Sequence, residues 1–128
     1  DGKDIIIIDD MISSGGSMLD TARQLKRMNA RRVYICCTFG LFTDGLKSFD
    51  HAYEQGYFDK VITTNLTYLP PEIHTRPYFV EADMSKFLAS IIDFMNHDVS
   101  LTNATATTEK IRHIVEVYNS RREFVTRD

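Results

Sequence analysis

Hydrophobic and polar positions follow two periods along the chain, and each period predicts an element. Four consecutive isoleucines, Ile5 to Ile8, form an unbroken apolar run, which is typical of a strand buried on both faces of a parallel sheet covered by helices. From Met18 to Met28 the apolar residues recur every three to four positions, which predicts a helix beginning near Ser17. A second apolar run, Val33 to Thr38, predicts the next strand. This order predicts a βαβ unit with a right-handed crossover.

The same patterns continue to the end of the chain. They predict, in order, a short helix over Leu46 to Tyr53 stopped by Gly56, a strand over Lys60 to Thr64, a strand over Tyr78 to Val80, and a helix capped by Asp83 or Ser85. The apolar stripe of that last helix is expected to join the core; its residues are Phe87, Leu88, Ile91, Ile92 and Met95.

The last part of the chain is predicted to be an extension. The polar stretch Leu101 to Thr108 is typical of a connector. Beyond it, apolar residues between Ile111 and Tyr118 share one helical face, which we expect to pack on its own domain or on a neighbouring subunit; a frayed basic tail is the alternative. We expect residues 1–101 to be the C-terminal part of an α/β domain whose upstream part is absent, and residues 102–128 to form a linker and an extension helix.

Candidate chemistry gathers where the first strand ends and the first helix begins. Two carboxylates close the strand, and a loop of small residues with hydroxyls and free backbone N–H groups follows. The residues are Asp9, Asp10, Ser13, Ser14, Gly15, Gly16 and Ser17. The first turn of a helix has unpaired N–H donors and the positive end of the helix dipole, and glycines allow a phosphate to approach the backbone.

The two carboxylates indicate which phosphate compound would bind. Because Asp9 and Asp10 would repel a phosphate, they are expected to face sugar hydroxyls or a bound Mg²⁺. The pattern therefore predicts a site for a phosphorylated sugar. A strand, a polar turn and a capped helix without any ligand is the simpler alternative. The carboxyl end of a parallel strand, where the loop lies, is where open α/β sheets bind ligands.

The stretch from Ile5 to Ser17 resembles the phosphoribosyl-diphosphate (PRPP) motif of the type I phosphoribosyltransferase fold, in the version found in ribose-phosphate diphosphokinases. The resemblance extends over roughly Asp4 to Ser100. It implies that Asp9 and Asp10 contact the ribose hydroxyls and that Ser13 to Ser17 hold the 5-phosphate. Which residues bind the metal is left open, and no residue of this chain is predicted to be catalytic.

Two positions depart from the family pattern. Ser13 stands where the loop usually opens with an acid, and Phe39 stands where a histidine is common. The turn at Phe39 and Gly40 either lies near the sugar or is an ordinary turn in which Gly40 has a positive φ. Thr63 to Asn65 either line the site or cap their strand. Ser100 is a candidate contact for a regulatory nucleotide phosphate.

Composition narrows the class of protein. With 128 residues, 43% hydrophobic and 26% charged, the chain suits one soluble domain. Its net charge of −3 and mixed signs give no reason to expect nucleic acid binding, and no apolar run approaches a membrane span. The only cysteines, Cys36 and Cys37, are neighbours in a strand and point to opposite faces, which favours a reducing, cytoplasmic compartment.

These observations lead to a functional hypothesis with two alternatives. The chain is predicted to be the part of a ribose-phosphate diphosphokinase that binds ribose 5-phosphate and PRPP, with Mg²⁺ as cofactor, in an oligomer. The start at Asp1 predicts a fragment, and ATP is expected to bind mainly through upstream residues. A phosphoribosyltransferase that uses PRPP, or a non-catalytic regulatory homologue, is the alternative.

Overall fold

The structure, a computed structural model, describes residues 2–97 and 107–125. It divides into two compact units, Asp1–Ser85 and Lys86–Asp128, and each is described by itself. The predicted domain boundary at residues 101–102, the candidate Ser100 and most of the predicted connector lie outside the described residues. That boundary stays a prediction.

The first unit is an open parallel sheet with helices. Its elements follow one another as β1 (Asp4–Ile12), α1 (Gly16–Arg27), β2 (Arg32–Gly40), α2 (Lys47–Glu54), β3 (Lys60–Thr64), the 3₁₀ helix η1 (Pro71–Thr75) and β4 (Phe79–Ala82). The strands stand in the order β1-β2-β3-β4, and every neighbouring pair is parallel. The predicted α/β fold with a parallel sheet is confirmed.

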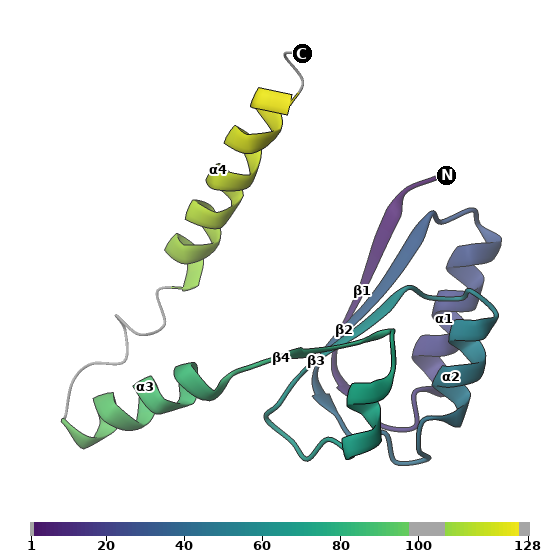
Figure 1. The fold of residues 1–128 in the computed structure, drawn as a ribbon, viewed down its shortest axis with the longest axis horizontal. Coiled ribbons are helices and arrows are strands. Elements are labelled where there is room, and N and C mark those ends of the chain that lie inside the picture. The colour runs from purple at the N-terminus through teal and green to yellow at the C-terminus, as the bar shows by residue number, and fades with distance from the viewer. Residues whose placement is uncertain (1, 98–106, 126–128) are drawn as a thin grey trace. The chain divides into compact units, whose positions relative to one another are not determined.

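Helices cover one face of this sheet. Figure 1 shows α1 and α2 on the same side of the strands. When each new strand is added on the same side of a parallel sheet, connections of the same handedness place all the connecting helices on one face. On that face Val33, Ile35 and Val61 are fully buried.

The opposite face of the sheet corrects the prediction that the isoleucine run is buried on both sides. Ile6 is 60% exposed and Ile8 is 79% exposed, while Ile5 and Ile7, on the helix side, are half-buried. Side chains alternate along a strand, so an unbroken apolar run supplies both faces but does not say whether both are covered.

A carboxylate ties the η1 region to α2. Asp50 accepts hydrogen bonds from Arg76 Nε (2.8 Å) and Nη2 (3.0 Å) and from the Tyr78 hydroxyl (2.8 Å). Burial opposes the ionisation of Asp50, but the hydrogen bonds from Arg76 and Tyr78 outweigh it and lower the pKa of this carboxyl. Burial, followed by the bond to Asp50, raises the pKa of Tyr78. The network therefore needs an ionised Asp50.

We expect Asp50→Asn to lower the free energy of unfolding by about 2 kcal/mol near pH 7, because charged hydrogen bonds are lost. Since the folded-state pKa of Asp50 is depressed, its contribution is present above the unfolded pKa of about 4 and disappears as the pH falls through the folded value. Urea unfolding of both proteins at several pH values measures this. The difference in the free energy of unfolding between the two proteins should shrink in acid. The control Asp20→Asn, which alters an exposed carboxylate of α1, should change the free energy of unfolding little. A difference that does not depend on pH would contradict the assignment.

The second unit contains α3 (Ser85–Asn96) and α4 (Thr107–Val125). The predicted stripe of α3 was expected to be core, but no residue of this helix is buried, and Phe87, Leu88, Ile92 and Met95 are 39–66% exposed. Helical periodicity shows which residues share a face and not what covers that face. The extension helix is present, and it begins at Thr107, within the stretch predicted as connector.

Candidate functional site

β1 carries the predicted site to the carboxyl edge of the sheet. The strand runs past Asp9 and Asp10 to Ile12, four residues further than the isoleucine run. Ile12 is buried, and its carbonyl accepts the Leu41 N–H at 2.8 Å. One residue on, the Ser13 carbonyl accepts the Thr43 N–H at 3.1 Å. The start of the loop is therefore held by the segment that follows β2.

The two glycines of the loop have different structural roles. Gly15 has a φ of 85°, and a Cβ placed there would overlap the ring of Phe49, which is fully buried. Gly15 is therefore required by both backbone conformation and packing. A Cβ on Gly16 would meet only the Ser14 Oγ, at 4.0 Å. Gly16 leaves open space in front of the loop.

The first backbone N–H groups of α1 have no carbonyl acceptor within the helix. The helix begins at Gly16 with Gly15 as N-cap, and its first α-helical bond runs from the Leu19 N–H to the Gly15 carbonyl at 3.0 Å. No side chain caps this end, and its first turn has no acidic residue. The N–H groups of Gly16, Ser17 and Met18 precede that bond and are free for an anion at the positive end of the helix.

A hollow of about 170 Å³ lies at this helix end. It brings together the predicted loop residues and one of the two acids. It is lined by Asp9, Met11, Ile12, Ser13, Ser14, Gly15, Gly16, Ser17 and Met18. The Asp9 Oδ1 accepts the Asp10 N–H at 2.9 Å, which orients this carboxylate at the rim. The hollow is thus a donor-rich pocket with one carboxylate beside it.

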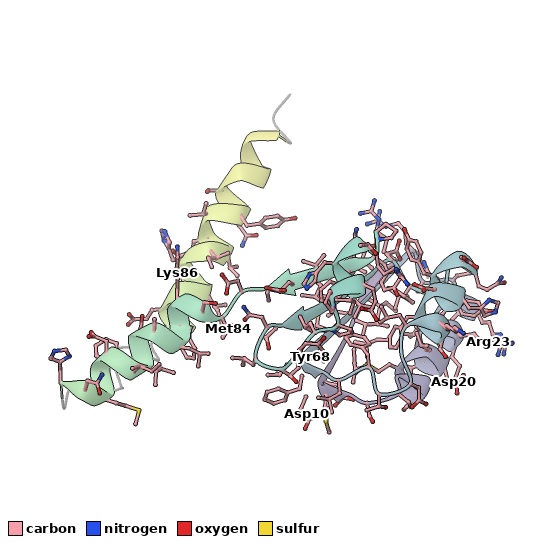
Figure 2. All side chains as sticks on the ribbon, turned by 60° about the horizontal axis from the view of Figure 1, so that its bottom comes forward. Asp10, Asp20, Arg23, Tyr68, Met84 and Lys86 are labelled. Carbon is pink, nitrogen blue, oxygen red and sulfur yellow. The ribbon has the colours of Figure 1, made fainter. Side chains whose placement is uncertain are left out.

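Asp10 is not part of that hollow. The lining of the hollow includes Asp9 but not Asp10, and Asp10 has no partner in the register that pairs β1 with β2. Figure 2 shows Asp10 at the surface of this unit, directed away from its interior.

A second hollow of about 210 Å³ adjoins Asp9 across the sheet edge, and Thr63 and Thr64 are among its lining residues. The Thr64 hydroxyl donates to the Thr38 carbonyl at 2.6 Å, which holds the ends of β2 and β3 together. Asn65, which follows the two threonines, instead bonds to the residues that precede α3 (Ser85–Asn96). The Asn65 Oδ1 accepts the Met84 N–H at 2.8 Å.

Gly40 departs from the predicted turn. It has no positive φ and belongs to β2; the positive φ values of this turn are at Phe42 (49°) and Gly45 (73°). A Cβ on Gly40 would lie 2.6 Å from the Phe42 ring and 2.9 Å from the Thr63 Cγ2. Close packing therefore requires this glycine. Phe39, beside it, is partly exposed at the strand end.

Two residues that support the loop were not predicted. Phe49 packs beneath Gly15, and Thr43 binds the loop backbone. Phe49 comes from α2, more than thirty residues downstream, and nothing in the local pattern marks its neighbour. The helical spacing from Leu46 to Tyr53 identified Phe49 only as apolar core.

The cysteines and the possible metal ligands add no catalytic chemistry of their own. Burial raises the pKa of the Cys37 thiol to about 11, so it is not a thiolate near neutral pH. Within residues 2–97 and 107–125, no three His, Cys, Asp or Glu side chains are grouped to hold a metal. The donor set nevertheless suits Mg²⁺, which commonly takes one or two carboxylates and completes its shell with substrate oxygens and water; Asp9 would be such a ligand.

Comparisons with known proteins agree with this geometry. Residues 1–63 match the family model of the phosphoribosyl transferase domain. The crystal structure of phosphoribosylpyrophosphate synthetase from Mycobacterium smegmatis superposes with a TM-score of 0.65 at 24% identity, over 76% of this chain and 31% of that one. The parallel sheet and the structural match show an α/β fold of the phosphoribosyltransferase type.

Curated relatives specify the resemblance further. Ribose-phosphate pyrophosphokinase of a Nostoc species is 31% identical over 102 residues, covering 80% of this chain and 30% of the relative. That of Synechocystis is 34% identical over 74 residues, covering 58% and 21%. The chain is therefore a relative of the ribose-phosphate pyrophosphokinases, also called diphosphokinases, as predicted. It spans less than a third of their length.

In the parts of the chain that the structure describes, no helix combines the length and the apolar character needed to cross a membrane.

Proposed function

We propose that this chain is the part of a ribose-phosphate diphosphokinase that binds ribose 5-phosphate and its product PRPP. In that reaction the diphosphoryl group of ATP moves to the anomeric hydroxyl of ribose 5-phosphate, giving PRPP and AMP. The observation that supports the proposal is the hollow at the first turn of α1, with uncapped N–H donors inside and Asp9 at its rim. The chain supplies the acceptor half of the active site.

In this proposal each group of the hollow has one role. The backbone N–H groups and serine hydroxyls of the loop donate to the 5-phosphate, because dianions bind well at a helix N-terminus. Asp9 accepts hydrogen bonds from the ribose hydroxyls, which orients the ring. With the phosphate and the ring held, the anomeric oxygen is positioned for in-line attack, and most of the benefit comes from this positioning.

Groups outside the loop complete the proposed site. Mg²⁺, when bound beside Asp9, would neutralise charge on the transferred diphosphoryl group. The ATP contacts and the basic residues that stabilise the transition state are proposed to come from parts of the protein beyond this chain. The protein is also proposed to assemble as an oligomer. The neighbouring hollow lined by Thr63 and Thr64 gives the reacting groups room beside Asp9.

Two other functions would use the same loop. A phosphoribosyltransferase would bind PRPP there and transfer its ribosyl group to a base; the match of residues 1–63 to the transferase domain model favours keeping this alternative. A regulatory homologue would retain the fold without catalysis, and the departures at Ser13 and Phe39 favour it. Formation of AMP from ATP and ribose 5-phosphate by the full-length parent would be expected only of the diphosphokinase.

An amide NMR titration of this chain with ribose 5-phosphate tests the binding role directly. We expect saturable shifts of the Gly16 and Ser17 amides, and no such shifts with ribose, which lacks the phosphate. The titration is repeated with and without Mg²⁺. If a folded sample shows no shift at the loop, the proposed binding role is wrong for this chain.

Variants of the two acids sharpen that titration. We expect Asp9→Asn to weaken binding about tenfold, because a charged acceptor is lost at the rim of the hollow. Asp10→Asn is the matched control: it removes the same charge one residue away, outside the lining of the hollow, and should change affinity by less than about threefold. Equal effects of the two substitutions would show that the affinity depends on net charge and not on a contact between ribose 5-phosphate and Asp9.

A further inference from the structure

A further pocket of the first unit lies far from the loop. Its volume is about 590 Å³, within the range of pockets that hold small ligands. It is lined by Lys26, Arg32, Tyr34, Tyr53, Gly56, Phe58, Asp59 and Lys60. Arg32 and Lys60 are the first residues of β2 and β3. The pocket is therefore at the amino ends of parallel strands whose carboxyl ends are near the loop.

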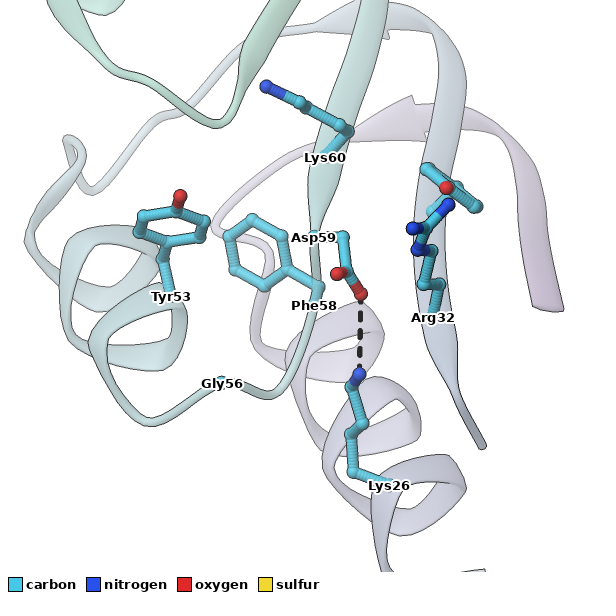
Figure 3. Close-up of a pocket in the computed structure, with 8 residues that line it drawn as sticks. Lys26, Arg32, Tyr53, Gly56, Phe58, Asp59 and Lys60 are labelled. Carbon is cyan, nitrogen blue, oxygen red and sulfur yellow. Dashed lines mark hydrogen bonds and ion pairs between the residues drawn. The ribbon is translucent and has the colours of Figure 1, made fainter. Parts of the chain in front are cut away.

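One wall of the pocket is a satisfied ion pair. The Lys26 Nζ lies 3.3 Å from the Asp59 Oδ2 and donates to the Arg31 carbonyl at 2.8 Å, and Asp59 also accepts the Val33 N–H at 2.9 Å. Figure 3 shows this pair across the bottom of the pocket. The carboxylate of Asp59 is therefore neutralised, and the pair does not repel an anion.

Two further cations line the pocket without a carboxylate partner of their own. Arg32 is exposed and is in no ion pair within the described residues, because the nearby Asp4 is engaged by Arg31 at 2.7 Å. Lys60 donates to the Pro77 carbonyl at 2.6 Å, which leaves its charge uncompensated. The pocket thus carries about two net positive charges on a chain whose total charge is −3. Such local excess attracts anions.

The remaining wall is aromatic. Tyr53 is half-buried and Phe58 is 2% exposed, and their ring centroids lie 5.8 Å apart. Phe58 packs in turn on the buried Tyr78, with centroids 5.3 Å apart, so this wall is held in place from behind. A rigid aromatic surface beside guanidinium and ammonium groups suits a ligand with a planar ring and an anionic group.

We propose that this pocket is a second ligand site, which binds small organic phosphates that carry an aromatic ring. Arg32 and Lys60 supply the positive charge that attracts the phosphate, and the ring packs against Tyr53. This inference does not rest on the proposed function, because the two sites are at opposite ends of the strands and have no lining residue in common.

The test is an amide NMR titration with phenyl phosphate as the probe. We expect saturable shifts at Gly56 and Lys60, and clearly weaker binding of methyl phosphate, which lacks the ring, and of phenol, which lacks the charge. The Gly16 and Ser17 amides report the loop separately. Shifts confined to the loop, or equal affinity for methyl phosphate, would overturn the proposal and would leave the loop function untouched.

A charge variant with a matched control completes the test. Arg32→Gln should weaken phenyl phosphate binding about tenfold, because a charged donor to phosphate is lost. Arg27→Gln removes the same charge from the exposed end of α1, outside the pocket, and should bind as the unmodified chain does. Both variants should unfold at the same urea concentration. If Arg32→Gln retains full affinity, Arg32 is not a phosphate contact and the proposal fails.

Discussion

Replacing Gly16 with valine is expected to weaken ribose 5-phosphate binding about 100-fold while the fold stays intact. A Cβ at this position meets no atom closer than 4.0 Å, so the protein itself has room for a side chain. The branched side chain would instead occupy the space in front of the first-turn donors. Losing two charged hydrogen bonds to phosphate costs about 3 kcal/mol, which corresponds to about 100-fold in affinity.

The measurement is the dissociation constant for ribose 5-phosphate, from titration of the loop amides, together with a urea unfolding curve. Gly16→Ala is the graded control: its single methyl group should weaken binding less than valine does. Both variants should have nearly the stability of the unmodified chain, since the first helical position tolerates most residues. Undiminished affinity in folded Gly16→Val would show that phosphate does not bind at this helix end.

The neighbouring Gly15→Ala substitution should act on stability instead. We expect it to lower the free energy of unfolding by about 3 kcal/mol. A left-handed backbone costs a residue with a Cβ about 1–2 kcal/mol, and overpacking adds about 1–3 kcal/mol. Here Gly15 has a φ of 85°, and the new methyl group would overlap the buried ring of Phe49.

Gly45→Ala separates these two contributions. Gly45 has a φ of 73°, but a Cβ there meets nothing within 4 Å. Gly45→Ala should therefore lower the free energy of unfolding only by the cost of the left-handed backbone, about 1–2 kcal/mol, in the same urea experiment. Equal losses at Gly15 and Gly45 would mean that the Phe49 ring moves aside without cost, and that packing beneath the loop is not what holds it.

Much of the loop region was predictable because it depends on residues close together in the chain. The isoleucine run, the helical spacing after Met18 and the glycine–serine loop between them predicted β1, α1 and the hollow at their junction. The structure extended β1 beyond Asp10 and started α1 at Gly16, one residue before the predicted Ser17. Strand and helix ends shift easily because few contacts decide them.

Other features were predicted as alternatives or not at all. The 3₁₀ helix Pro71–Thr75 was not predicted. A turn with a positive φ at Gly40 was one of two alternatives, whereas its closeness to Phe42 and Thr63 explains the glycine. The packing of Gly40 depends on a contact with Thr63, which is distant in sequence. The 3₁₀ helix depends on a backbone geometry that residue type alone does not specify.

The sequence by itself determined the parallel α/β architecture and the place of the glycine–serine loop, because apolar periodicity and glycine–serine chemistry act over a few residues. Only the tertiary structure decided that helices cover one face of the sheet, that Asp9 and not Asp10 reaches the loop hollow, and that Gly15 rests on Phe49. It alone brought Lys26, Arg32 and Asp59 around one pocket. Packing brings together side chains from separate helices and strands. A local sequence pattern does not show which distant residue a side chain will contact.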